Sequence, residues 1–188
     1  MSLRLKSFAA RTALSFLATA SAAQSTIAWP EHSRVMAEEI TQEYGAPDAV
    51  QSSQLSWIGH RPWKLTVVYR EDPAPGRPNG IEQSVSYEVP VRKWRELGAF
   101  DRGVEYDPVA RELIARAGSE MANILALNLA DEVIRGRRTA ADAREFYDKT
   151  LSLSFSGKSS PYMRKLRFRP QNLPEEPRAL ISSRPGRT

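Results

Sequence analysis

The stretch YGAPDAVQSSQLSWIGHRPWKLTVVYR, residues 44–70, decides how this chain folds. Gly45 and Pro47 end a preceding helix, because glycine accepts the backbone conformation that follows a helix and proline cannot continue one. Residues 54–58 and 63–70 then alternate apolar and polar side chains, a pattern typical of β-strands. The glycine and the proline between them predict a turn. We therefore expect a helix followed directly by a β-hairpin.

The same kind of periodicity predicts elements on both sides of the hairpin. Residues 31–44 repeat apolar side chains with the period of a helix, and residues 81–89 alternate as a further strand. A short helix follows Pro90. The apolar arc of residues 120–135 is wide enough for a helix that is buried on most sides. Thr139 begins a last helix with a capping box.

Residues 103–117 fit two interpretations. As a helix, Asp107 and Pro108 would serve as the N-cap and the first helical residue. As a hairpin, the residues on either side of Pro108 alternate and the proline lies in the turn. We prefer the hairpin, because Gly118 and Ser119 then begin the next helix with a new N-cap.

Together these elements predict an α+β fold. We expect an antiparallel sheet of three to five strands, helices packed on one face of it, and two helices at the C-terminal end of the domain. A single domain spans residues 24–157. Asn123 falls within the apolar arc of its helix, and a buried amide must be hydrogen-bonded. We therefore assign a structural role to Asn123, as to Gly45 and Pro47.

The N-terminus has the layout of a Sec-type signal peptide. A positively charged start precedes a short apolar run and a group of small residues that ends at Ala23. Cleavage is expected after Ala23 or Ala22, so that residues 1–23 are removed. The apolar run is too short to span a bilayer, and the chain has no cysteine that could carry a lipid. The sequence thus predicts a periplasmic or secreted protein without a transmembrane segment.

The excess positive charge lies at the two ends of the chain. The formal net charge is +5 overall, whereas residues 24–157 carry −4 and residues 158–188 carry +6. A mildly acidic domain argues against a nucleic-acid partner. Residues 158–188 are basic and rich in proline, and we expect them to be largely disordered. Weak contact of this tail with an anionic membrane surface is a further expectation.

Residue types for common catalytic and metal sites are scarce. The chain contains two histidines, His32 and His60, and no cysteine, so no metal site is predicted. A Gly-x-Ser-x-Gly nucleophile elbow is absent from the sequence. We therefore assign no catalytic residue and no cofactor.

Aromatic and basic side chains gather on the predicted hairpin, and they form the candidate binding set. Its members are Trp57, His60, Trp63, Lys64, Tyr69 and Arg70. Tryptophan, tyrosine and arginine dominate binding hot spots, which favours a surface for a partner. The preferred alternative is that the aromatic side chains form the sheet core and the cations its solvated face, because alternation alone predicts this.

Two resemblances bear on the function. The segments YGAPD, LSW, WKLTVVYR and ILALNLADEVIRG resemble a family of small exported bacterial proteins with no assigned activity, over residues 36–168. That resemblance implies a shared fold and no catalytic residues. Locally, a helix followed by Tyr-Gly-x-Pro and a Trp/Tyr-rich hairpin is similar to the small-protein-A/outer-membrane-assembly lipoprotein fold, whose members are envelope adaptors. This chain lacks their lipid-bearing cysteine and has a long, mostly helical C-terminal half.

These observations predict a non-catalytic binding or adaptor module of the bacterial envelope. Its partner would be an envelope protein or a small ligand. The alternative is a periplasmic hydrolase with its active site near residues 44–70. That activity would require Asp48, His60 and a serine such as Ser53 to meet in space.

Overall fold

The structure is a computed structural model, and it describes Thr26, residues 28–71 and residues 80–171. The predicted signal peptide, with its cleavage site at Ala22 or Ala23, lies outside the described residues, and so do residues 172–188. None of the helices in the described part of the chain is both long and apolar enough to cross a membrane.

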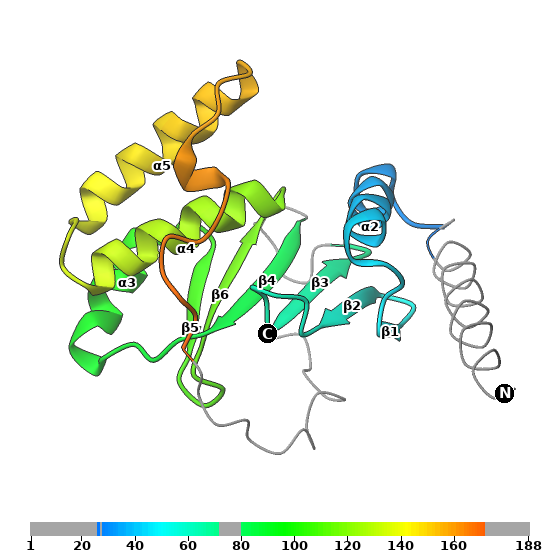
Figure 1. Ribbon diagram of the computed structural model, residues 1–188, viewed down its shortest axis with the longest axis horizontal. Helices are drawn as coiled ribbons and strands as arrows, with labels where there is room; N and C mark the ends of the chain where they lie inside the picture. The colour runs from blue at the N-terminus through cyan, green and yellow to red at the C-terminus, as the bar shows by residue number, and fades with distance from the viewer. Residues whose placement is uncertain (1–25, 27, 72–79, 172–188) are drawn as a thin grey trace, which may run out of the picture.

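Six strands form one antiparallel sheet in the order β1-β2-β3-β4-β6-β5 (Figure 1). The strands are β1 (Ala49–Val50), β2 (Gln54–Ile58), β3 (Leu65–Tyr69), β4 (Ile81–Ser86), β5 (Val104–Asp107) and β6 (Glu112–Ala117). The α+β class with an antiparallel sheet is confirmed, but the expected three to five strands were too few. The two residues of β1 are too short to show a period in the sequence.

The hairpin interpretation of residues 103–117 is confirmed, and the helix alternative is wrong. β5 and β6 pair in register from Val104 with Ala115 to Asp107 with Glu112. The turn between them is stabilised by Asp107, whose Oδ1 accepts the N–H groups of two following residues at 2.9 and 3.0 Å. An aspartate that bonds to its own backbone in this way favours a turn over a helix interior.

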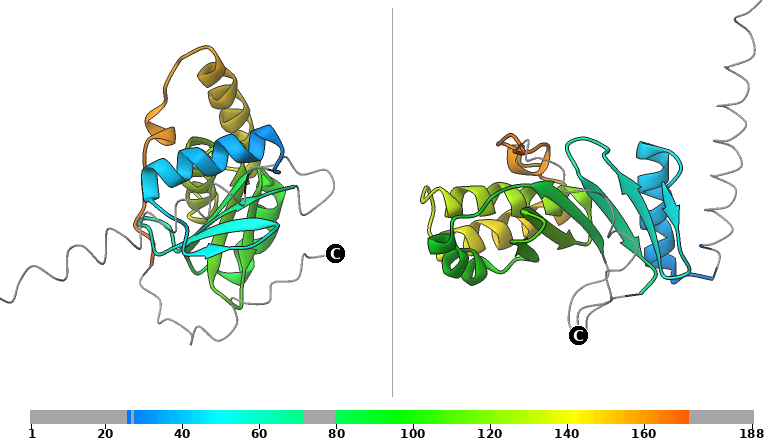
Figure 2. Two further views of the ribbon diagram at one scale, coloured as in Figure 1. Left: turned by 90° about the vertical axis from the view of Figure 1, so that its right-hand side faces the viewer. Right: turned by 90° about the horizontal axis from the view of Figure 1, so that it is seen from below.

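In the described residues, the main helices are α2 (Glu31–Tyr44), α3 (Trp94–Phe100), α4 (Glu120–Ile134) and α5 (Ala140–Phe155). A 3₁₀ turn, η1 (Val91–Lys93), leads into α3. In Figure 2, α3, α4 and α5 group together at one end of the sheet, and α2 lies at the other end. The two expected C-terminal helices correspond to α4 and α5.

Both helix groups cover the same face of the sheet. Ladder partners share a face, so Leu55, Val68 and Ile81 lie together, and α2 packs over them. On the same face, α4 packs over Val85 and Leu113 of β4 and β6. Two hydrophobic clusters therefore lie side by side on one sheet face, one under α2 and the other under α4.

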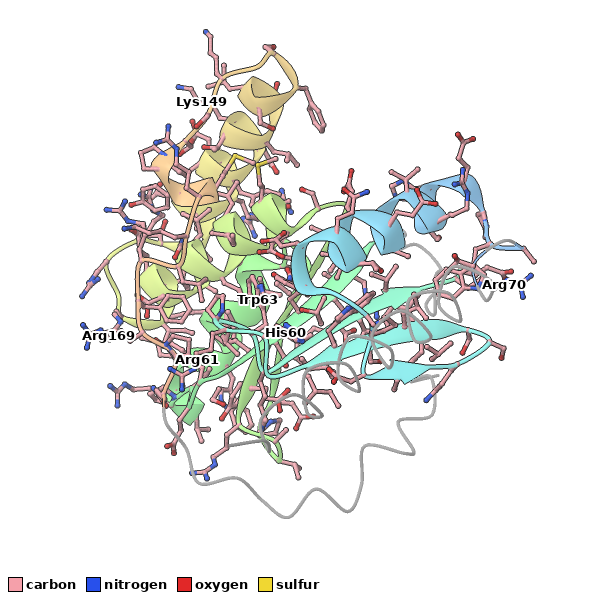
Figure 3. All side chains as sticks on the ribbon, turned by 45° about the vertical axis from the view of Figure 1, so that its right-hand side comes forward. His60, Arg61, Trp63, Arg70, Lys149 and Arg169 are labelled. Carbon is pink, nitrogen blue, oxygen red and sulfur yellow. The ribbon has the colours of Figure 1, made fainter. Side chains whose placement is uncertain are left out.

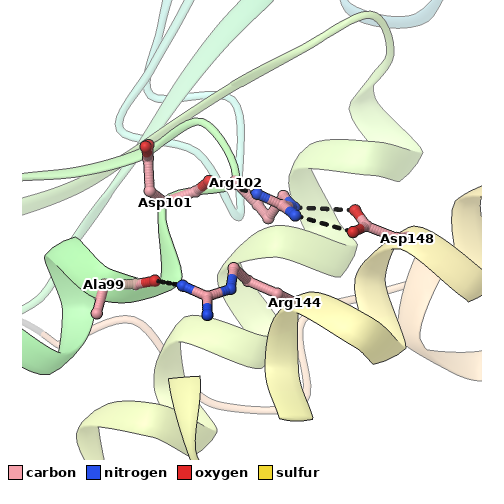
Figure 4. A network of polar contacts seen from close by, with 5 residues as sticks. All are labelled: Ala99, Asp101, Arg102, Arg144 and Asp148. Carbon is pink, nitrogen blue, oxygen red and sulfur yellow. Dashed lines mark hydrogen bonds and ion pairs between the residues drawn. The ribbon is translucent and has the colours of Figure 1, made fainter. Parts of the chain in front are cut away.

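A bidentate ion pair between Arg102 and Asp148 connects α5 to the segment that follows α3 (Figure 4). The Arg102 guanidinium donates from Nε and Nη2 to the two carboxylate oxygens of Asp148 at 2.9 and 2.8 Å. Arg144 donates to the carbonyl of Ala99 nearby. The hydrogen bonds from Arg102 hold the pKa of Asp148 below its usual value. These contacts hold α5 beside the connection that follows α3.

Residues 158–171, the first part of the segment expected to be largely disordered, pack against α4. Met163 of the 3₁₀ turn η2 (Pro161–Met163) is buried. The buried Asn128 of α4 donates to the carbonyl of Tyr162 at 2.9 Å and accepts the N–H of Arg167 at 2.6 Å. The sequence does not predict this packing, because Asn128 holds the segment by hydrogen bonds to its backbone and the segment has no periodic apolar face.

Candidate functional site

The candidate binding residues separate along the β2–β3 hairpin (Figure 3). His60, Trp63 and Lys64 lie at its turn, whereas Arg70 lies at the far end of β3. The aromatic and basic set therefore does not form one continuous surface.

Trp57 belongs to the core beneath α2. Its side chain is fully buried, and its indole Nε1–H donates to the carbonyl of Gly45 at 3.0 Å. Gly45 ends α2 with a φ of +85°, a conformation that glycine adopts without strain. Pro47, which follows, is buried as well. These three residues hold the end of α2 against β2, and Trp57 forms no part of an accessible face.

Trp63 is also buried, and it is part of a hydrogen-bond chain. Its Nε1–H donates to the phenolic oxygen of Tyr44 at 2.9 Å. The Tyr44 hydroxyl in turn donates to Oε2 of Glu120 at 2.6 Å. Burial raises the pKa of Tyr44, and the hydrogen bond to Glu120 raises it further. Burial and the charge of Glu120 also raise the pKa of the neighbouring Glu43 carboxyl.

The chain continues from Glu120 into the sheet. Gln83 donates to Glu120 Oε2 at 2.8 Å, and Asn123 donates to Gln83 Oε1 at 3.0 Å. Asn123 also donates to the carbonyl of Ile81 at 2.9 Å, so its structural role rests on strand β4. Tyr44 and Glu120 are 76 residues apart, and nothing in the sequence links them. The network joins α2, the hairpin, β4 and α4 where the two hydrophobic clusters meet.

His60 is the accessible end of this network. Its ring stacks on the Tyr44 ring with centroids 5.2 Å apart and planes 26° apart. Its Nε2 lies 3.8 Å from Oδ2 of Asp48, which accepts the N–H of Ile58 at 2.7 Å. The His60 side chain is 33% exposed and that of Asp48 is 47% exposed. The imidazole is thus held on two sides and open on the others.

Lys64 points to the opposite face of the sheet from Trp63. Its ammonium lies 2.8 Å from Oε1 of Glu112. Glu112 alternates along β6 with Leu113, which packs under α4, so Glu112 lies on the face away from the helices. The Lys64 side chain is 42% exposed, and it brings a cation to the rim of the hairpin turn.

Tyr69 and Arg70 have structural contacts at the other end of the hairpin. The Arg116 guanidinium lies 4.5 Å from the centre of the Tyr69 ring and pairs with Glu82. The carbonyl of Arg70 accepts the Ser33 hydroxyl at 2.8 Å, which fixes α2 to the end of β3.

The residues of the alternative hydrolase do not converge. Asp48 and His60 meet at the hairpin turn, but Ser53 precedes β2 at its opposite end, roughly 15 Å away along the strand. The carbonyl of Ser53 accepts the N–H of Arg70 there. Within the described ranges, no group of three or more His, Cys, Asp or Glu side chains is placed to hold a metal ion.

We compared the chain with protein families, curated protein sequences and solved structures. No protein family, no curated protein sequence and no solved structure matches this chain.

Proposed function

We propose that this protein is a non-catalytic binding or adaptor module of the bacterial envelope. Its binding surface is the hairpin corner, which we define as Asp48, His60, Arg61 and Lys64. The observation that carries this proposal is the stack of His60 on Tyr44, whose hydroxyl is itself bonded to Trp63 and Glu120. Side chains that are already held in place lose little conformational freedom on binding.

The corner combines several kinds of recognition group around the β2–β3 turn. It offers an imidazole ring, the exposed guanidinium of Arg61, the Lys64 ammonium and the Asp48 carboxylate. The exposed Arg61 guanidinium, next to His60 in the turn, suits a partner that brings carboxylate groups, such as an acidic segment of an envelope protein or a small anionic ligand, whereas the Lys64 ammonium is already paired with Glu112. Export of the protein to the envelope stays a prediction from residues 1–23.

Trp57 and Trp63 are buried next to the hairpin corner, so variants of these residues cannot test binding separately from folding. Replacing Trp57 or Trp63 by alanine would cost about 3–5 kcal/mol of stability and confound a binding assay. His60→Ala and Arg61→Ala instead change exposed atoms. Val109, which is 86% exposed in the β5–β6 turn, offers a matched control position on the same sheet.

A photo-cross-linking residue at position 61 or 109 tests the proposal in envelope extract. We expect one stoichiometric product from position 61, none from position 109, and loss of the product when His60→Ala is added. The same product from both positions would place the interface elsewhere. If position 61 gives no product and small anionic ligands do not shift the thermal midpoint of the folded protein, the corner is not a binding surface.

A further inference from the structure

The C-terminal end of α5 leaves an aromatic side chain almost fully exposed to solvent. Phe155, the last residue of the helix, is 84% exposed, and Leu153 is 38% exposed. The buried residues of α5, Ala143, Tyr147 and Thr150, all lie before this last turn. In Figure 1 this end of α5 projects away from the sheet. The last turn of α5 thus adds little to the core and presents an aromatic ring to solvent.

The residues that precede and follow this helix end in the sequence are positively charged. Residues 149–171 contain six lysines and arginines and no aspartate or glutamate. Lys149 and Lys158 are exposed on either side of the helix end, and Lys149 is labelled near it in Figure 3. The Arg164 guanidinium donates twice to Ser159 Oγ, at 3.1 and 2.9 Å, which holds it beside the chain reversal after α5. In the part of the chain that the structure describes, these three cations form no ion pair.

We propose that this α5 tip, defined as Lys149, Leu153, Phe155, Lys158 and Arg164, docks on an anionic lipid surface. Phe155 enters the interfacial region of the bilayer, and the three cations lie beside the lipid phosphates. One apolar anchor alone binds a membrane only marginally, and a basic patch supplies the second signal that stable binding requires. The docking site therefore combines the last turns of α5 with the first part of the basic segment, which the structure describes as far as residue 171.

Charge favours a lipid surface over a second copy of the chain. Two copies that met through their tips would bring six cations together without an acidic group between residues 149 and 171 to offset them. The exposed apolar surface consists mainly of one phenylalanine, which is far less than the area of a stable protein–protein interface. Lipid phosphates supply the opposite charge, and the bilayer interface accepts an aromatic ring.

Cosedimentation of the mature chain with vesicles tests this proposal. Vesicles of phosphatidylcholine with phosphatidylglycerol are compared with vesicles of phosphatidylcholine alone. We expect binding only to the anionic vesicles. Each lost cation should weaken binding about fivefold, so the triple variant Lys149→Gln, Lys158→Gln and Arg164→Gln should lose on the order of a hundredfold. Phe155→Ser should weaken binding about tenfold, because it removes the aromatic ring that enters the bilayer interface.

Two control variants separate the tip from other cations. Arg92→Gln, Arg95→Gln and Arg137→Gln remove the same charge from exposed positions away from the tip, and binding should stay within about twofold of the original chain. A variant with Arg178, Arg184 and Arg187 changed to Gln tests the tail. Equal losses from all three triple variants would show unspecific charge attraction, and a loss confined to the tail variant would move the site there.

Two further outcomes would also overturn the proposal. One is a lack of preference for anionic vesicles by the unmodified chain. The other is a change of oligomeric state in solution on Phe155→Ser, measured by light scattering, because the ring would then cover a second copy. Thermal unfolding of each variant checks the fold, and exposed residues at the tip should leave the midpoint nearly unchanged.

Discussion

The indole Nε1–H of Trp63 donates to the phenolic oxygen of Tyr44, at 2.9 Å, and so joins the hairpin turn to the end of α2. The same phenolic group donates its own proton to Glu120 at the start of α4. One hydroxyl thus connects three elements that meet between the two hydrophobic clusters. The position of His60 depends on it, because the His60 ring stacks on Tyr44.

Tyr44→Phe should lower the free energy of unfolding by about 1–3 kcal/mol, because it leaves the Trp63 indole without its acceptor in a buried setting. Urea unfolding measures the change. Trp63→Phe removes the donor, and the double variant closes a double-mutant cycle with an expected coupling energy of about 1 kcal/mol. Strict additivity of the two single changes would show that the hydrogen bond contributes nothing.

Asn128→Ala should release residues 158–171 from α4. The amide of Asn128 donates to the carbonyls of Tyr162 and Lys165 and accepts the N–H of Arg167, and alanine satisfies none of these groups. Trypsin should then cleave after Lys165 and Arg167 many times faster than in the unmodified chain. Asn123→Ala on the same helix is the matched control, since it lowers overall stability without touching this segment. Similar cleavage rates in both variants would show that the hydrogen bonds of Asn128 do not hold this segment on α4.

Gly103→Ala should destabilise the protein by about 2 kcal/mol or more. The residue has a φ of +71°, and a Cβ atom there would lie 2.2 Å from the carbonyl oxygen of Arg116. Gly98→Ala, inside α3 with open space around it, should instead stabilise by about 0.5–1 kcal/mol. Thermal or urea unfolding of the two variants compares them. Equal effects would mean that the β5–β6 hairpin tolerates a side chain at residue 103.

Stability should fall at alkaline pH, and Tyr87 should account for a measurable part of the fall. Burial, followed by the hydrogen bond to Asp131, raises the pKa of Tyr87 from 10.0 to about 12. A pKa raised on folding means that the stabilisation is fully present below pH 10 and is lost as the pH rises from 10 towards 12. The loss from this group is up to about 2–3 kcal/mol.

Urea unfolding over that pH range, for the unmodified chain and for Tyr87→Phe, measures this contribution. The variant should be less stable at neutral pH, because Asp131 loses a donor, and its stability should decline less steeply above pH 10. A decline as steep as that of the unmodified chain would assign the alkaline loss to other groups. Tyr44, Tyr147 and Tyr162, whose pKa values are also raised, would then be the next candidates.

The local sequence determined the main helices and the two hairpins, although β3 and β4 are shorter than the strands expected at residues 63–70 and 81–89. The predicted helix at residues 31–44 has the same bounds as α2. Ser119 and Thr139 cap α4 and α5 with their side chains, as their positions before apolar periodic runs predicted. These signals are readable because a cap, a turn or a period involves residues within a few positions of one another, so the neighbours in the sequence are also the neighbours in space.

Only the tertiary structure decided which polar residues meet. Glu120 bonds to Tyr44, and Asn128 holds Arg167, across 76 and 39 residues. His60 lies beside Asp48 but far from Ser53, because Ser53 and His60 lie at opposite ends of strand β2. A polar side chain looks the same in a sequence whether it is solvated or buried in a network. Its partner depends on strand register and on where each helix crosses the sheet, and packing of the whole chain determines both.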